Sequence, residues 1–546
     1  MNTPKILSTA YPPEACRFVP ETETSHILGG SRHMMTPIDL EAYGYVEEEY
    51  IVKGHANIYH WEDNERYPHI LFSHAPYCTR MIVRKPRDPK KFSGIIHCEL
   101  MNPNSGLDRS NAGWAPCHEY LMSRGHGSIS FTMSEVSMKG LRRFDPERYG
   151  ELGFKNPIPK DQRMPASVWL DGNPIDEETE NGLQYDFYSQ TAALIKSGRE
   201  DSPFAGYDFK KIMLQGTTGG DLSAYVAAVH PITKLPDGTP CFDGFLIFMT
   251  GAPGFLNNSR YMLDPFDFRD LYYSEVPFIH LNTVADLLGD TMHPSWSTLW
   301  HRYQPNEKGR YLRLIEIAGA GIGRKYTAPY GNCKEDMEKA LGAKHGSGPA
   351  GPGERQSVPG GPEAQPGGTG ASGSSGEQPG GAEGRQNGPG GRPLIDGTGR
   401  METGTRPQGP GPVRGEMLEF PAHLIVCAMI DNLIKWMLTG AAPEIVPWIE
   451  MEGEYPEMTF ARDEYGAFKG GVRSPYADCP LVVTDASGMI LRHLSSEELK
   501  TLYGSREGYV EKVKESVQRM IAHGHLLPEH ARIMIEEAMS GTFPLE

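Results

Sequence analysis

The residues 211–231 have the types and spacing of a turn that could present a nucleophile. An apolar run at 212–214 has the length of a short buried strand, and the small-residue turn 216–220 (GTTGG) follows it. Apolar residues then recur at the spacing of one helix face: Leu222, Tyr225, Val226 and Val229. Strand, tight glycine-rich turn and helix is the setting of a nucleophile elbow, G-x-S-x-G, and Thr218 stands at the position of its serine.

Thr218 is therefore the candidate nucleophile, and its hydroxyl would need an imidazole to take its proton and a carboxylate to orient that imidazole. The elbow residue is generally held at positive φ, where a β-branched side chain is strained. The alternative is that Thr218 is only a turn residue. Gly216 would tolerate this backbone but carries no nucleophile, and the backbone N–H of Gly219 could form half of an oxyanion hole.

Candidates for the acid, the base and the second oxyanion donor are residues that follow expected strands or that follow the acid in the sequence. Asp286 follows an expected strand and suits the acid, the alternative being a helix cap. Four histidines follow it: His293, His301, His345 and His423. We take His423, at the start of an expected helix, as the candidate base, although a lone histidine is more often structural. Asn102 and Asn104 follow a strand end and could complete the oxyanion hole or simply form a turn.

These residues require a framework of alternating strands and helices. The sequence predicts strands at 45–59, 79–86, 94–100, 127–133, 212–214, 242–249, 276–282 and 311–317. It predicts helices at 114–123, 185–196 and 422–440, a helix that ends at Gly524 and another that begins near Pro528. This alternation favours an α/β fold with a mostly parallel sheet and helices on both faces. Residues 134–180 read as an irregular, cap-like region.

The composition of the chain indicates a separate Gly/Pro-rich segment and argues against some classes of binding partner. Residues 346–415 are rich in Gly and Pro and poor in large apolar residues, so we expect a disordered insertion. Residues 1–345 and 416–546 would then form one domain. A net charge of −17 argues against nucleic acid as a partner. No run reaches the roughly 18 apolar residues of a membrane span, and no apolar signal segment begins the chain, so we expect a soluble, cytoplasmic protein.

Motifs for bound cofactors and metals do not occur in the sequence. The chain lacks a P-loop, a G-x-G-x-x-G loop and an H-E-x-x-H pair, and we expect no cofactor. The eight cysteines form no C-x-x-C pair, which indicates buried free thiols rather than a zinc site or a disulfide framework.

Several stretches together resemble the large bacterial α/β-hydrolase domain-containing proteins, an esterase-like family. They are YVEEEYIVKGHANIY, TRMIVRKPRDPKKFSGIIHCELMNPNSGLD, DPERYG, the turn with YVAAVHP, and GGVRSPYADCPLVV. The resemblance spans nearly the whole chain outside the insertion. It implies an α/β-hydrolase fold and ester hydrolysis by a triad of serine, acid and histidine.

The sequence departs from that family where the chemistry should be. The family elbow reads roughly G-x-S-Q-[ST], which aligns its serine with Thr218 from the strand side and with Gly216 from the helix side. The family's histidine follows a strand that ends in E-x-A-G, but no histidine follows Gly319 closely.

Two hypotheses follow from these departures. The first is a hydrolase of small hydrophobic esters with a non-standard nucleophile. The second is a protein that has lost the triad and binds a small hydrophobic molecule or performs non-hydrolytic chemistry. Aromatic residues near the cap-like region could line the pocket or belong to the core: Trp114, Trp169, Tyr185, Tyr188, Tyr261, Phe266, Tyr272 and Tyr273.

Overall fold

A computed structural model gives the positions of most of the chain. It describes residues 5–61, 67–103, 106–110, 112–163, 176–217, 221–249, 256–258, 274–287, 311–319, 326, 328–342, 416–453, 459–541 and 543. The insertion expected at 346–415 lies outside these residues, and so do Thr218, Gly219 and Asn104.

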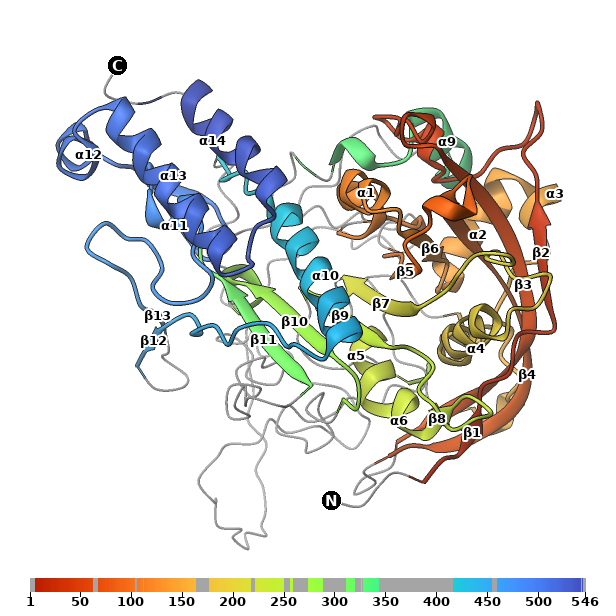
Figure 1. The fold of residues 1–546 in the computed structure, drawn as a ribbon. Helices are drawn as coiled ribbons and strands as arrows, with labels where there is room; N and C mark the ends of the chain where they lie inside the picture. Colours follow the sequence, from red (N-terminus) through yellow and green to blue (C-terminus); the bar gives the residue numbers. More distant parts are fainter. Residues whose placement is uncertain are drawn as a thin grey trace, which may run out of the picture. The chain divides into compact units, whose positions relative to one another are not determined.

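Nine strands in the described parts of the chain form one sheet (Figure 1), in the order β11-β10-β9-β7-β5-β6-β4-β3-β2. Neighbouring strands from β6 to β11 are parallel, whereas β2, β3, β4 and β6 pair antiparallel. The strands are β2 (Ala15–Val19), β3 (Tyr45–His60), β4 (His69–Pro86), β5 (Ile95–Leu100), β6 (Gly127–Phe131), β7 (Lys211–Thr217), β9 (Gly244–Phe248), β10 (Phe278–Thr283) and β11 (Leu312–Ile317).

The described α-helices pack against the two faces of the sheet and against one another. They are α1 (Trp114–Ser123), α2 (Glu135–Phe144), α3 (Pro146–Tyr149), α4 (Gln184–Ser197), α5 (Asp221–Ala224), α6 (His230–Ile232), α9 (Lys334–Leu341), α10 (Ala422–Thr439), α11 (Pro475–Asp478), α12 (Ser496–Tyr503), α13 (Arg506–Ala522) and α14 (Ala531–Ser540). Short two-stranded pairs join β1 (Ser8–Thr9) to β8 (Thr233–Lys234), β12 (Met451–Glu452) to β13 (Thr459–Phe460), and β14 (Val482–Thr484) to β15 (Ile490–His493).

Alternating side chains of the parallel strands build two separate cores. In β7, Leu214 packs with one cluster and Met213 with the other, and in β9 Ile247 and Leu246 divide in the same way. One cluster includes α4 and α5, and the other includes α1, α10 and α13. Because successive strand residues point to opposite faces, apolar residues at every position require helices on both faces. The predicted α/β fold with a mostly parallel sheet is confirmed.

The apolar character of α10 is explained by its place in this core. It is the one described helix long and apolar enough to cross a membrane by length and composition, but 61% of that stretch is buried inside the protein. It packs against β9, β10 and α1 (Figure 1). Gly440 ends it with φ 75°, a left-handed conformation that suits glycine.

The prediction of an irregular region at 134–180 is wrong for its first part, which forms α2 and α3. Ser134 caps α2 by accepting a hydrogen bond from the N–H of Val136. Met138, Leu141 and Phe144 are then buried at a spacing of three residues. The many charged residues of this stretch obscure a narrow apolar face, which is enough for a helix on the protein surface.

The remaining differences concern short or shifted elements. β4 begins ten residues before the predicted start at 79, and the strand β2 and the helix α12 were not predicted. All eight cysteines are free, and seven are buried, as expected; Cys333 is partly exposed.

Candidate active site

Asn102, Thr217 and Asp286 lie at or just beyond the carboxyl ends of β5, β7 and β10. Strands that run parallel present these ends at one edge of the sheet, the edge where ligands bind in open α/β sheets. Asn102 lies just beyond β5, Thr217 ends β7, and Asp286 lies three residues beyond β10. The candidate base His423 belongs instead to the first turn of α10.

The structure brings Asn102 to the strand that precedes the candidate nucleophile. Its side-chain Nδ2 donates a hydrogen bond of 3.3 Å to the backbone oxygen of Thr217. Its backbone N–H and C=O each pair with Arg109 at 2.9 Å, which closes a small loop beyond β5. Asn102 is 5% exposed, so its side chain is held against the end of β7, one residue before Thr218.

Two buried side chains on the strands hold the rest of this loop. Glu99 accepts hydrogen bonds from the hydroxyl of Ser110 at 2.7 Å and from the backbone N–H of Trp114 at 3.0 Å. Gln215 donates to the backbone oxygen of Ala112 at 2.9 Å. Burial raises the pKa of Glu99, and these hydrogen bonds oppose that rise. Ser110, Ala112 and Trp114 are thereby positioned by β5 and β7 together.

The strand and the helix around the predicted elbow are present. β7 ends at Thr217 and α5 begins at Asp221, so only residues 218–220 separate them. The side-chain oxygen of Thr217 is buried and has no hydrogen-bond partner among the described residues. Gly216 lies so close to the helix that a Cβ there would stand 2.7 Å from the Cβ of Leu222. A larger residue at 216 would therefore push the helix away.

The helix that follows the turn contains an irregularity that the sequence pattern did not predict. The π-helical segment η7 (Tyr225–Val229) links α5 to α6, and the N–H of His230 donates to the carbonyl of Tyr225. Single π-turns inside α-helices occur often at functional sites. The four apolar residues that predicted the helix face are all buried.

Asp286 lies at the carboxyl edge with one carboxylate oxygen fixed. Its Oδ2 accepts hydrogen bonds from the backbone N–H and the hydroxyl of Thr283, at 2.7 and 2.8 Å. The bond from the backbone N–H of Thr283 is one half of a capping box, in which Thr283 precedes the helical turn 284–287. Although the residue keeps some exposed surface, burial of the carboxylate raises its pKa to about 6. Asp286 is still largely ionised at pH 7, as the acid of a triad must be.

His423 stands among other rings rather than beside an acid. Its ring centroid lies 5.2 Å from that of Tyr326, and its Nδ1 has no hydrogen-bond partner among the described residues. Burial, together with His530 and His118, lowers the pKa of His423 to about 4. Among the described hydrogen bonds, none joins His423 to Asp286. His293, His301 and His345 lie outside the described residues.

Two further polar residues belong to this region and were not singled out from the sequence. Asn282 is fully buried at the end of β10, and both polar atoms of its side chain are without partners in the described structure. Asp221, the first residue of α5, accepts a hydrogen bond of 3.0 Å from Gln184. Asn282 could have been found in the sequence as a polar residue at the carboxyl end of an apolar strand. Asp221 could have been found as an acidic residue at the first position of the helix.

Three of the eight candidate aromatic residues belong to the core, and the other five lie outside the described residues. Trp114, Tyr185 and Tyr188 are fully buried and belong to the core. The others lie outside the described residues.

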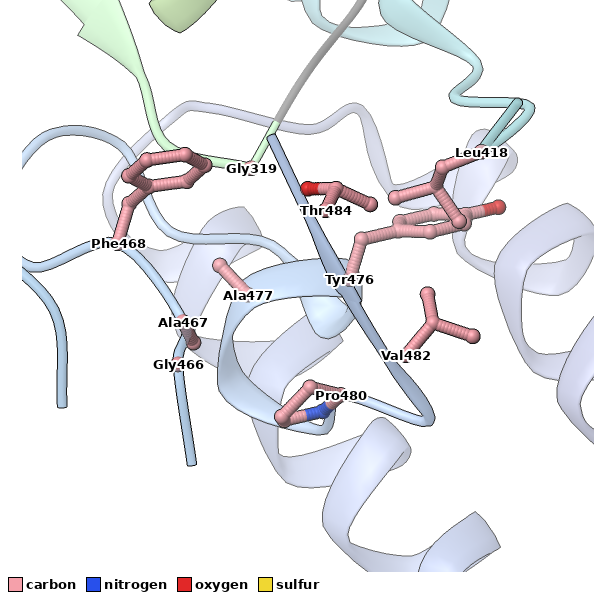
Figure 2. A pocket seen from close by; sticks show the side chains of 10 residues that line it. All are labelled: Gly319, Leu418, Gly466, Ala467, Phe468, Tyr476, Ala477, Pro480, Val482 and Thr484. Atoms are coloured by element: carbon pink, nitrogen blue, oxygen red, sulfur yellow. The ribbon is translucent and has the colours of Figure 1, made fainter. Parts of the chain in front are cut away.

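A small hollow lies beyond the end of β11, where a triad histidine was sought. Figure 2 shows its lining: Gly319, Leu418, Gly466, Ala467, Phe468, Tyr476, Ala477, Pro480, Val482 and Thr484. Its volume of about 10 Å³ has room for at most one water molecule. Side-chain oxygens in this wall come from Tyr476 and Thr484 (Figure 2). This hollow is too small for a substrate.

Comparison with solved structures gives similarities to several hydrolases at low identity. Esterase 2 of Thermogutta terrifontis is 17% identical, with 44% of this chain and 77% of that chain covered and a TM-score of 0.24. Poly(aspartic acid) hydrolase-1 from Sphingomonas sp. KT-1 is 12% identical, with coverages of 44% and 86% and a TM-score of 0.25. An alpha-beta serine hydrolase homologue from Coxiella burnetii is 10% identical, with coverages of 49% and 92% and a TM-score of 0.24.

We base the family assignment on the match to a family model, because those TM-scores are all below 0.5. A comparison with curated protein sequences found no match. The model of the alpha/beta hydrolase domain matches residues 12–358 and 391–536, which is most of the chain. The match agrees with the strand order of the sheet and with the resemblance found in the sequence. The chain belongs to the family of the alpha/beta hydrolase domain.

Proposed function

We propose that the protein hydrolyses carboxylic esters of small hydrophobic molecules at the carboxyl edge of its sheet. The observation that carries this proposal is the hydrogen bonding of the Asp286 carboxylate. Thr283 occupies only the Oδ2 of its carboxylate. No described residue donates a hydrogen bond to Oδ1, and this oxygen is the one we assign to the N–H of an imidazole, which is the task of the acid in a triad.

The chemistry follows from these roles. The hydroxyl of Thr218 attacks the ester carbonyl while an imidazole takes its proton, and the imidazole then returns that proton to the departing alcohol. Water next hydrolyses the acyl ester on Thr218 by the same route in reverse. The backbone N–H of Gly219 and a side-chain amide of Asn102 or Asn104 stabilise the oxyanion. The 3.3 Å contact of Asn102 with Thr217 supports its place in this set.

The base is the role that the described residues support least. The Nδ1 of His423 has no partner in the part of the chain that the structure describes, but its low pKa and its ring neighbours make it a weak partner for Asp286. His293, His301 and His345 also follow Asp286 in the sequence and are the alternatives. Replacing each of the four by alanine in turn identifies the base as the one whose loss abolishes turnover.

A second function is favoured because no hydrogen bond among the described residues joins His423 to Asp286. A protein that has lost its triad would keep the edge of the sheet as a binding site for a small hydrophobic molecule. Asn282 and Thr217 offer buried polar atoms, without partners among the described residues, that a ligand could satisfy. Such a protein would bind esters without hydrolysing them.

Substitution of Asp286 by asparagine distinguishes the two functions. Turnover of short p-nitrophenyl esters should fall by about 10³ to 10⁴, because asparagine cannot stabilise the imidazolium that forms. Wild-type activity should also fall as the pH drops through about 6, where Asp286 gains a proton. Asp237→Asn, in an exposed turn, is the control and should leave the rate unchanged. Wild-type turnover that survives in Asp286→Asn would refute the proposed role of this acid.

A further inference from the structure

A cluster of metal-binding side chains joins the N-terminal segment to α9. His26 and His33 come from the segment between β2 and β3, and Asp336 comes from the first turn of α9. One ligand atom from each of these residues lies within 4.8 Å of the other two. Two imidazoles and a carboxylate are the protein ligands found in many zinc sites with an open fourth position.

The carboxylate of the cluster is buried, whereas its two histidine side chains are partly exposed, so an ion can reach the site from solvent. The carboxylate of Asp336 is 7% exposed and forms the buried base of the cluster. His26 Nε2 lies 3.1 Å from both of its oxygens. The ring of His33 stacks on that of His26 at 3.7 Å, and its side chain is 32% exposed. The rings are nearly parallel, so an ion would be bound after His33 rotates, for which its exposure leaves room.

Backbone pairing holds the two segments together independently of these side chains. The N–H of Cys333 donates to the oxygen of His33 at 3.1 Å, and the N–H of Met35 donates to the oxygen of Gly331 at 2.8 Å. A bridge also pairs Met34 with Asn332. The ligands are therefore brought together before any ion arrives, which lowers the entropy cost of binding one.

A further carboxylate lies beside the cluster. The carboxylate of Glu21 lies 3.9 Å from His33 Nε2 and adds negative charge at the open side.

We infer that His26, His33 and Asp336 form a binding site for a divalent transition metal ion such as zinc. Nitrogen ligands from two imidazoles select such an ion over magnesium or calcium, which prefer oxygen ligands. Glu21 or a water molecule supplies the fourth ligand. The bound ion connects the N-terminal segment to the helix that precedes the insertion, so it stabilises the folded protein. The sequence offered no motif for this site, because its ligands are separated by 310 positions.

Titration of the metal-free protein with zinc chloride tests this site. After dialysis against a chelator, calorimetry should show one zinc ion bound per chain, and the melting temperature should rise with zinc. Cobalt(II) in place of zinc should give visible absorption bands of a four-coordinate ion. His33→Ala and Asp336→Asn should each weaken zinc binding at least about tenfold. His33 is partly exposed, so its variant should fold, which circular dichroism checks.

A second stacked histidine pair supplies the matched control. His55 stacks on His74 at 4.3 Å and lies 2.6 Å from Glu14, but these three do not converge as closely. His55→Ala should leave zinc binding unchanged. Absence of saturable binding in the wild type, or wild-type affinity in both His33→Ala and Asp336→Asn, would show that the cluster is only an ion pair. Loss of binding in His55→Ala alone would place the site at the other pair.

Discussion

Burial sets the protonation of two carboxylates that flank the start of α4. Glu180 is 2% exposed and accepts hydrogen bonds from the backbone N–H groups of Gly182 and Asn258, at 2.8 and 3.0 Å. Burial nevertheless raises its pKa to about 7. Asp186 accepts a hydrogen bond of 2.6 Å from the hydroxyl of Tyr59, and burial raises its pKa to about 6. Both residues therefore take up protons near neutral pH.

The glutamate makes the stability of the protein depend on pH. Its folded-state pKa exceeds the ordinary value of 4.5, so its contribution is fully present below about pH 4.5 and is lost as the pH rises through 7. Glu180→Gln keeps an acceptor oxygen but does not titrate. The difference in unfolding free energy between wild type and variant should shift by up to about 3 kcal/mol between pH 4.5 and 7.5, with the wild type favoured at low pH. Urea denaturation at a series of pH values measures it, and parallel profiles would contradict the assignment.

Residues at strand ends could be predicted from the sequence, but their partners could not. Asn102 and Asp286 stand where apolar runs stop, so their place near the carboxyl edge follows from local pattern alone. The contact of Asn102 with Thr217 joins residues 115 positions apart, and Asn258 lies 78 positions from Glu180. Such pairs depend on which strands become neighbours. The same limit hid the proximity of His26 and His33 to Asp336.

At the scale of elements, the pattern around the turn predicted the strand and the helix face but not the π-turn. The apolar spacing fits an α-helix, whereas the structure inserts η7 between α5 and α6. Pro231 offers a physical reason: it has no N–H to donate and crowds the carbonyl of Ala227, four residues earlier. The backbone widens just before this proline, where the N–H of His230 bonds to Tyr225 instead.

The close approach of β7 to α5 gives a prediction for Gly216. A Cβ at this position would stand 2.7 Å from the Cβ of Leu222, so Gly216→Ala should destabilise the protein by about 1 to 3 kcal/mol. Gly153→Ala is the matched control, because a Cβ there meets nothing closer than 3.9 Å. Urea denaturation of both variants makes the comparison. If Gly216→Ala is as stable as Gly153→Ala, the packing of this turn is not as described.

At the scale of the whole molecule, the alternation of strands and helices was enough to predict the class of fold. Apolar runs without alternation indicated strands buried on both faces, and the two cores confirm that. The order of the strands was not readable from local pattern, because it depends on how each crossover turns.

The insertion is predicted to contribute nothing to the stability of the hydrolase domain. Residues 346–415 are poor in large apolar residues, and a long surface loop costs only about 0.6 kcal/mol of closure free energy per doubling of length. Replacing 346–415 by a short Gly/Ser linker should leave the melting temperature nearly unchanged. A fall of many degrees would show that the insertion packs against the domain.

The central claim, ester hydrolysis by the turn after β7, is tested most directly by turnover of short p-nitrophenyl esters in Thr218 variants. Thr218→Ala should abolish hydrolysis, on the order of 10⁶-fold where a triad nucleophile is lost. Thr218→Ser should retain or raise it, because serine lacks the β-methyl group that resists the strained elbow. Thr217→Ala tests the neighbouring hydroxyl and should keep the activity. Turnover unchanged in Thr218→Ala, or lost in Thr217→Ala instead, would contradict the claim.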